Sequence, residues 1–161
     1  MKFDTRSFRS ALGTFATGIT VVTSIGPDGE RLGFTANSFN SVSLDPPLVL
    51  FSLDRGAFSL RGFEAAGVFA INVLSEEQQE TSIAFARALV DKWQGVAFET
   101  WETGCPILTH ALASFECETT SMHDGGDHVI FVGRVIRLRA AEHGKPLLYF
   151  RGAYRQIDQL D

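Results

Sequence analysis

Residues 33–47, Gly-Phe-Thr-Ala-Asn-Ser-Phe-Asn-Ser-Val-Ser-Leu-Asp-Pro-Pro, carry the most informative pattern in the chain. The segment begins as a strand and then places short hydroxyl and amide side chains close together: Thr35, Asn37, Ser38, Asn40, Ser41 and Ser43. Two interpretations are open. Such a pattern is typical of a polar connection between strands, in which short side chains hydrogen-bond their own backbone. It is also typical of a site where backbone and short polar groups closely approach a flat, hydrogen-bonding ligand.

The segments on both sides of this stretch favour strands. Residues 18–25 are rich in Thr, Ile and Val, and the turn signal Gly26-Pro27-Asp28-Gly29 joins them to a second hairpin strand at residues 31–36. After Pro46 and Pro47, residues 48–53 form a short apolar run that predicts a strand buried on both faces. Further strands are predicted at residues 68–74, 112–120, 129–139 and 147–150.

Helices are predicted at residues 6–16, 58–66 and 75–89. The first places Phe8, Leu12 and Phe15 at helical spacing, and the last begins at Ser75 with Gln78 at the capping-box position. Residues 91–104 are predicted to be irregular. About seven strands joined largely by hairpins, with two or three helices, predict a mainly β protein: an antiparallel barrel with helices packed outside it.

The composition limits the class of protein. A chain of 161 residues, 45% of them hydrophobic, predicts one globular domain over residues 1–161. The net charge of −5 gives no electrostatic reason to bind nucleic acid. No apolar run approaches the roughly 18–20 residues that span a bilayer, and no signal peptide is recognisable. Cys105 and Cys117 lack metal-ligand spacing, so we expect a cytoplasmic protein with free thiols, and no membrane partner.

Most familiar site motifs are absent. The segment Gly13–Gly18 has the glycine spacing of a phosphate loop, but it lacks the following Lys and precedes a strand. No Gly-x-Gly-x-x-Gly motif of a Rossmann fold occurs. The cluster His123-Asp-Gly-Gly-Asp-His128 leaves three interpretations: a metal site, a plain hairpin turn, or a loop that brings His128 over a bound ring. The metal site is disfavoured because so short a loop can hardly turn four ligands onto one ion, so no metal is predicted.

The segment Ser52-Leu-Asp-Arg-Gly-Ala-Phe-Ser59 follows a predicted strand and opens a predicted helix. A helix N-terminus offers free N–H groups and a favourable dipole to an anion. Arg55 and Ser59 add further donors, so this segment is a candidate phosphate site. The alternative is an ordinary helix start with a solvated arginine.

Five segments, in order, resemble the flavin reductase family with the FMN-binding split-barrel fold. They are residues 8–23 (Phe-Arg-Ser-Ala-Leu-Gly-Thr-Phe-Ala-Thr-Gly-Ile-Thr-Val-Val-Thr), 35–49 (Thr-Ala-Asn-Ser-Phe-Asn-Ser-Val-Ser-Leu-Asp-Pro-Pro-Leu-Val), 67–74 (Gly-Val-Phe-Ala-Ile-Asn-Val-Leu), 126–135 (Gly-Asp-His-Val-Ile-Phe-Val-Gly-Arg-Val) and 146–154 (Pro-Leu-Leu-Tyr-Phe-Arg-Gly-Ala-Tyr). Each motif alone is weak, whereas five in sequence over the whole chain are specific.

The resemblance implies an antiparallel split β-barrel and an NAD(P)H-dependent flavin reductase. Such an enzyme passes a hydride from NADH or NADPH to FAD or FMN, and the reduced flavin supplies a partner monooxygenase. A homodimer is also implied. Because fold does not determine function, a non-catalytic flavin- or haem-binding split barrel is the alternative.

The resemblance also implies a set of site residues. The isoalloxazine ring would lie against Thr35, Ala36, Asn37 and Ser38. The ribityl and phosphate side would be lined by Ser52, Leu53, Asp54, Arg55 and Ser59, and the rest of the cofactor by Phe85, Ala86 and Arg87. The nicotinamide would face His128, Arg151 and Tyr154, with His128 as the predicted catalytic contact. Relatives often carry Lys or Thr where this chain has Ala-Phe-Ser at residues 57–59, which leaves the choice between FMN and FAD open.

Overall fold

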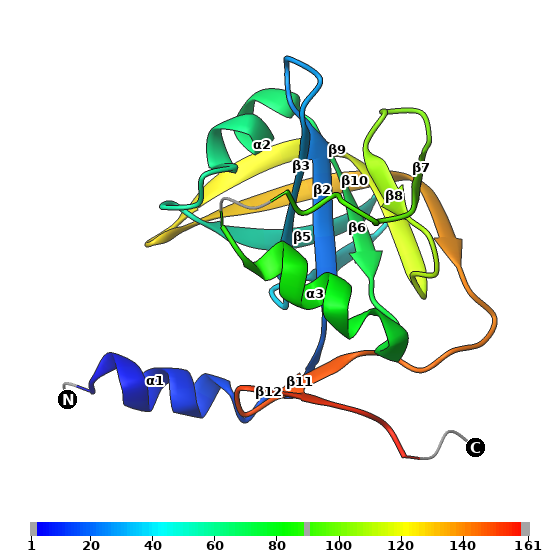
Figure 1. Ribbon diagram of the computed structural model, residues 1–161. Coiled ribbons are helices and arrows are strands. Elements are labelled where there is room, and N and C mark those ends of the chain that lie inside the picture. The colour runs from blue at the N-terminus through cyan, green and yellow to red at the C-terminus, as the bar shows by residue number, and fades with distance from the viewer. Residues whose placement is uncertain (1–2, 89–90, 159–161) are drawn as a thin grey trace.

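Seven antiparallel strands form the main sheet of the computed structural model, which describes residues 3–88 and 91–158. Their order in the sheet is β3-β2-β6-β9-β10-β5-β4 (Figure 1). Their bounds are β2 Thr20–Ile25, β3 Arg31–Ala36, β4 Asn40–Leu44, β5 Pro47–Asp54, β6 Val68–Val73, β9 Ala113–Gly125 and β10 His128–Ala140. The long hairpin of β9 and β10 joins the two halves of the sheet.

The sheet curls on itself into a barrel. Its two edge strands, β3 and β4, are consecutive in the chain and are linked by residues 37–39 alone. A link of that length spans at most about 14 Å, whereas the edges of a flat seven-stranded sheet would lie about 29 Å apart. The edges therefore approach each other, and no ladder joins them in the part of the chain that the structure describes. The predicted antiparallel split barrel is confirmed.

Phenylalanine rings fill the barrel. Phe51 of β5 and Phe131 of β10 lie opposite each other and stack with ring centroids 4.8 Å apart, and Phe69 of β6 meets Phe51 edge-on at 4.9 Å. Helix α2 (Leu60–Ala66) adds Phe63, which contacts Phe51 at 5.9 Å. All four rings are buried. Since burial of one such side chain contributes about 1.5–3 kcal/mol, this cluster anchors the strands that carry the site.

The remaining elements lie around the barrel. Helix α3 (Gln79–Ala86) follows the 3-10 turn η1 (Glu76–Gln78) and packs against β3. Strands β7 (Phe98–Thr100) and β8 (Pro106–Leu108) form a small hairpin. A second small sheet contains β1 (Thr17–Gly18), β11 (Leu148–Phe150) and β12 (Ala153–Arg155). Helix α1 (Thr5–Leu12) extends away from the barrel (Figure 1), whereas Tyr149 and Tyr154 of this sheet pack against the cluster that contains Val21 of β2.

The structure bears out most predicted elements and corrects some. Strand β4 was not predicted, and neither were the short strands β7, β8 and β12. Helix α1 is shorter than the predicted 6–16. The helix predicted to reach residue 89 ends at Ala86, because the backbone of Arg87 is extended, and residue 89 itself lies outside the described residues. At its start, the Ser75 backbone N–H donates to Gln78 Oε1 at 3.1 Å, as the capping pattern predicts. None of the described helices is both long and apolar enough to cross a membrane.

Candidate functional site

A cavity of about 640 Å³ opens beside β3. Its volume falls within the range of about 300–1,000 Å³ that is usual for small-molecule sites. Four parts of the chain form its walls: β3 with the link to β4, the end of β5 with the start of α2, the end of α3 with residues 91–93, and the first residue of β10. The segment from which the sequence analysis began is therefore one wall of this cavity.

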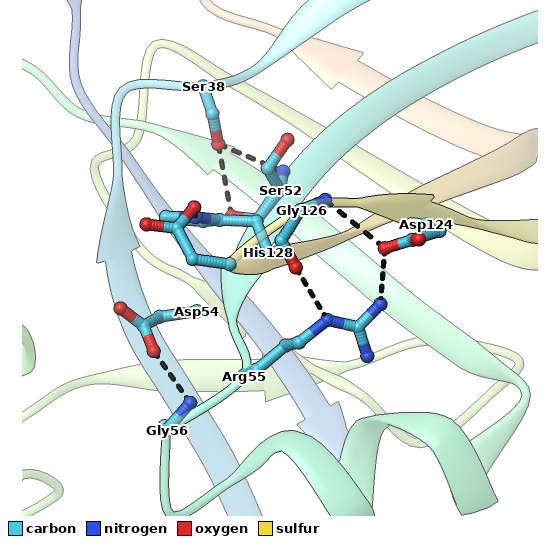
Figure 2. A network of polar contacts seen from close by, with 9 residues as sticks. Ser38, Ser52, Asp54, Arg55, Gly56, Asp124, Gly126 and His128 are labelled. Carbon is cyan, nitrogen blue, oxygen red and sulfur yellow. Dashed lines mark hydrogen bonds and ion pairs between the residues drawn. The ribbon is translucent and has the colours of Figure 1, made fainter.

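The hydroxyl groups of this wall bind backbone from other segments. Ser38 Oγ accepts the Ser52 backbone N–H at 3.0 Å and donates to the Ser52 carbonyl at 3.2 Å (Figure 2). Thr35 Oγ1 donates to the Ser82 carbonyl of α3 at 2.6 Å. The Ser38 bonds connect the link at residues 37–39 to β5, and the Thr35 bond connects β3 to α3. The polar side chains thus build the wall, and Asn37 presents an exposed amide beside it.

The backbone edge of β3 is open where it borders the cavity. In this edge strand, the carbonyl of Ala36 faces β2, where it accepts the Thr20 hydroxyl, whereas the carbonyls of Arg31 and Gly33 face outward. Because the N–H and C=O groups of successive residues in a strand point alternately to the two sides, the N–H and C=O of Thr35 face outward like those of Arg31 and Gly33. Side chains satisfy the carbonyls of Arg31 and Gly33, and the edge at Thr35 lines the cavity. A flat ligand with donors and acceptors at its rim can pair with such an edge.

Two residues that the sequence analysis did not predict, Lys92 and Trp93, cover the outer edge of β3 beside the cavity. Lys92 Nζ donates to the carbonyls of Gly33 and Phe85, each at 3.2 Å, and Trp93 Nε1 donates to the Arg31 carbonyl at 3.1 Å. The Trp93 ring meets Phe85 edge to face at 4.9 Å. Desolvation by burial lowers the pKa of Lys92. The partners on β3, Gly33 and Arg31, lie 59 and 62 residues away in the chain, so no local sequence signal reveals these contacts.

Arg31 and Arg87 add positive charge to the same cavity. The Arg31 guanidinium lies over the ring of Trp93, 5.5 Å from its centroid, and over that of Phe98, at 5.2 Å. With Lys92, three basic side chains line this end of the cavity, and Glu30 and Asp91 are their acidic neighbours. This end favours an anionic group of a ligand.

His128 also lines the cavity. It is the first residue of β10 and pairs in register with Asp54 at the end of β5. Its Nδ1 is hydrogen-bonded to Asp127 Oδ1 at 2.7 Å, and this bond holds the pKa of Asp127 below its usual value. Because Nδ1 is engaged, Nε2 is the ring nitrogen left to contact a ligand. The loop before His128 is the turn of the β9–β10 hairpin, and a role of His128 over a bound ring stays a prediction.

Most of the predicted site residues line this cavity: Thr35, Ala36, Asn37, Ser38, Ser52, Leu53, Asp54, Ser59, Phe85, Ala86, Arg87 and His128. Three do not. The guanidinium of Arg55 contacts Asp124 and Gly126 instead (Figure 2). Arg151 lies between β11 and β12, and the Tyr154 hydroxyl shares a 2.9 Å hydrogen bond with Ser82 Oγ. Their predicted roles toward a ligand stay predictions, as do those of the lining residues.

The described part of the chain contains no group of three or more His, Cys, Asp or Glu side chains that is arranged to hold a metal ion. His123 instead shares a 2.9 Å hydrogen bond with Ser121.

Comparison with known proteins identifies the family. Residues 12–158 match the flavin reductase like domain. The chain belongs to the flavin reductase family. It is 44% identical over 155 residues to the reductase subunit HsaB of a flavin-dependent monooxygenase from Rhodococcus jostii (strain RHA1), covering 96% of this chain and 79% of that protein. It is 46% identical over 161 residues to the FMN reductase (NADH) SmoA of Agrobacterium fabrum, covering 97% and 88%.

Solved structures of the flavin reductase family share the fold. The NADH:FAD oxidoreductase SgcE6 of Streptomyces globisporus, in complex with NAD and FAD fragments, superposes with a TM-score of 0.91 at 37% identity, covering 96% of this chain and 93% of that chain. Some relatives are longer: the chain spans 49% of a probable flavin reductase of Rhizobium meliloti. The enzyme class expected from the resemblance, a flavin reductase, is confirmed.

The residues of the cavity fit a flavin. The open backbone edge at Thr35 and the exposed amide of Asn37 suit the donors and acceptors at the rim of an isoalloxazine ring. The three basic side chains of Arg31, Arg87 and Lys92 suit the negatively charged phosphate of a flavin nucleotide.

Proposed function

We propose that the protein is an NAD(P)H-dependent flavin reductase whose flavin lies in the cavity between β3, β5 and the end of α3. The observation that carries this proposal is the wall at residues 35–38, where an open strand edge and short polar side chains line one cavity with three cations. Relatives of this chain include an FMN reductase that uses NADH and an oxidoreductase of NADH and FAD. The choice between FMN and FAD, and between NADH and NADPH, is left to the assay.

A bound flavin supplies the hydride-transfer chemistry, so the protein needs no general acid or nucleophile. Its task is to hold two rings at reacting distance and to keep the geometry constant. The wall at Thr35 and Asn37 orients the flavin rim. We expect His128, which lines the same cavity, to hydrogen-bond the nicotinamide end of the dinucleotide. Lys92 and Arg87 offset the negative charge of the ligands.

The reduced flavin is proposed to serve a partner monooxygenase, because relatives carry names of reductase subunits of such enzymes. A homodimer is proposed on separate grounds. Helix α1 has no buried residue, and its apolar side chains Phe8 and Leu12, with Phe15 just after it, are 48%, 57% and 77% exposed. A second copy of the chain would cover this apolar stripe. The cytoplasmic location stays a prediction from the sequence.

The test is a steady-state assay of NADH and NADPH oxidation with FMN, with FAD and without flavin. We expect oxidation only when a flavin is added or retained. Flavin binding without any oxidation of either nucleotide would favour the non-catalytic flavin-binding alternative. A protein that neither binds flavin nor oxidises nucleotide would refute both. Sedimentation at several protein concentrations tests the dimer.

A further inference from the structure

Arg55 joins two loops at the mouth of the cavity. It follows β5, and its side chain crosses to the tip of the β9–β10 hairpin (Figure 2). Arg55 Nε donates to the Gly126 carbonyl at 2.8 Å, and Nη2 donates to Asp124 Oδ1 at 2.7 Å. The backbone N–H of Arg55 also donates to the Asp127 carbonyl at 2.9 Å. One residue thus makes three hydrogen bonds to three positions of one turn.

These bonds complete a network within the tip itself. The Asp124 carboxylate that accepts from Arg55 also accepts the Gly126 backbone N–H at 3.1 Å. Gly126 has φ +78°, a conformation that favours glycine, and its carbonyl is the acceptor for Arg55 Nε. The hydrogen bond and charge of Arg55 hold the pKa of Asp124 below its usual value. The conformation of the turn and the position of Arg55 therefore depend on each other.

The turn leads directly into His128. Asp127, whose backbone carbonyl is held by Arg55, carries the side chain that binds His128 Nδ1 at 2.7 Å. His128 and Asp127 are 41% and 90% exposed at their side chains, so packing alone does little to fix the imidazole. The turn orients the imidazole. On the β5 side, the turn is held by the pairing of His128 with Asp54, by the backbone N–H of Arg55, and by the Arg55 side chain, which alone reaches Asp124 and Gly126 at the tip.

We propose that Arg55 is a positioning residue that acts through the hairpin tip on His128, and not a ligand of the flavin phosphate. The proposal rests on the proposed function, because it gives His128 a contact with the dinucleotide. Two neighbouring donors of one planar guanidinium bridge a carbonyl and a carboxylate here, which an ammonium group cannot reproduce. Arg55→Lys should therefore behave like Arg55→Ala and not like the wild type.

The experiment compares Arg55→Ala, Asp124→Ala and the double variant in the purified full chain. The matched control is Arg134→Ala, because Arg134 and Glu118 form an exposed ion pair of the same 2.7 Å length within the β9–β10 hairpin, outside its tip. For each variant we measure the Michaelis constant for NADH, the turnover number, and the dissociation constants of FMN and riboflavin. Riboflavin lacks the phosphate, so the last two values separate a phosphate ligand from a positioning residue.

Loss of one hydrogen bond to a ligand weakens binding roughly tenfold. Arg55→Ala should misplace His128 without removing it, so we expect the NADH Michaelis constant to rise by about threefold, which is only part of that loss. Turnover and both flavin affinities should change by less than about twofold. The double variant should match the single variants, because partners in one network are not additive. The control should leave all values unchanged. Weaker binding of FMN but not of riboflavin, or additive effects of the two single changes, would overturn the proposal.

An NMR measurement separates this proposal from the proposed function. In the flavin-free protein, the ring signals of His128 should shift in Arg55→Ala and stay unchanged in Arg134→Ala. Unchanged His128 signals in Arg55→Ala would refute the positioning role even if the wild type is a flavin reductase. If the His128 signals shift in Arg55→Ala but the wild-type protein has no flavin-dependent activity, the proposed function is refuted while the positioning of His128 by Arg55 stands.

Discussion

Replacing Gly33 by alanine tests the packing behind the wall of the cavity. Gly33 is buried in β3, and a Cβ atom there would lie 2.6 Å from Cε1 of Phe85 and 3.3 Å from Cζ2 of Trp93. Real Cβ atoms essentially never approach a carbon atom as closely as 2.6 Å. The Phe85 ring cannot simply swing away, because it is buried and meets Trp93 edge to face at 4.9 Å. The end of α3 must therefore move away from β3.

The expected loss of stability follows from two opposing terms. Overpacking a buried site costs about 1–3 kcal/mol. The change from glycine to alanine also restricts the unfolded chain, which offsets about 0.4–1 kcal/mol of that loss. We therefore expect Gly33→Ala to lower the free energy of unfolding by roughly 1–2 kcal/mol. Since Phe85 lines the cavity, the affinity for flavin should fall as well.

Urea unfolding at constant protein concentration measures the stability, and a fluorescence titration measures flavin affinity. Gly18→Ala in β1 is the control, because a Cβ atom there would meet nothing within 4 Å. Phe85→Leu supplies a second test, since it removes the ring atoms that the new methyl group would meet. In that background Gly33→Ala should cost clearly less. Equal stability of Gly33→Ala and Gly18→Ala, or strict additivity with Phe85→Leu, would refute the packing argument.

Four further expectations concern the site and the thiols. Asn37→Leu should weaken flavin binding about tenfold in a titration without changing the urea midpoint, because the side chain is exposed. His128→Ala should raise the NADH Michaelis constant about tenfold in steady-state kinetics and leave flavin affinity nearly unchanged; the reverse pattern would exchange the two ligands. Cys105 and Cys117 are buried, which raises the pKa of both thiols, so neither should react with a thiol reagent before urea unfolds the chain. Because the pKa of Lys92 is lowered, the folded state loses this proton at a lower pH than the unfolded state does. The free energy of unfolding of the wild type should therefore rise relative to that of Lys92→Met as the pH increases toward 10.5, which urea titrations at several pH values measure.

The barrel could be predicted because its strands carry local signals. Alternating or continuous apolar runs bounded by glycine and proline marked β2, β3, β5, β6, β9 and β10, and hairpin turns made them antiparallel. Strand β4 was missed for a physical reason: its residues are mostly exposed and polar, since it lies at the edge of the sheet. The short strands β7, β8 and β12 have three residues each, too few for any periodicity.

The site was predictable only where it is local in sequence. Residues 35–38 form one wall as a continuous segment, so their composition pointed to a site. Lys92 and Trp93 reach the same wall through contacts with Gly33 and Arg31 that are 59 and 62 residues distant in the chain. Arg55 carried the expected donor chemistry, but the partner that takes its charge, Asp124, is 69 residues away. Side-chain orientation of this kind depends on which strands become neighbours.

The edge of β3 explains why the site lies where it does. An exposed edge strand presents unpaired N–H and C=O groups, which favour pairing with other chains unless they are covered. Here Trp93 and Lys92 cover the edge at Arg31 and Gly33, and the barrel does not close over the part that follows. The peptide groups at Thr35 are left facing a cavity that is large enough for a flat ring. A ligand that pairs with this edge satisfies the same groups that an additional strand would satisfy, so binding by this protein and the incomplete closure of its barrel have one structural cause.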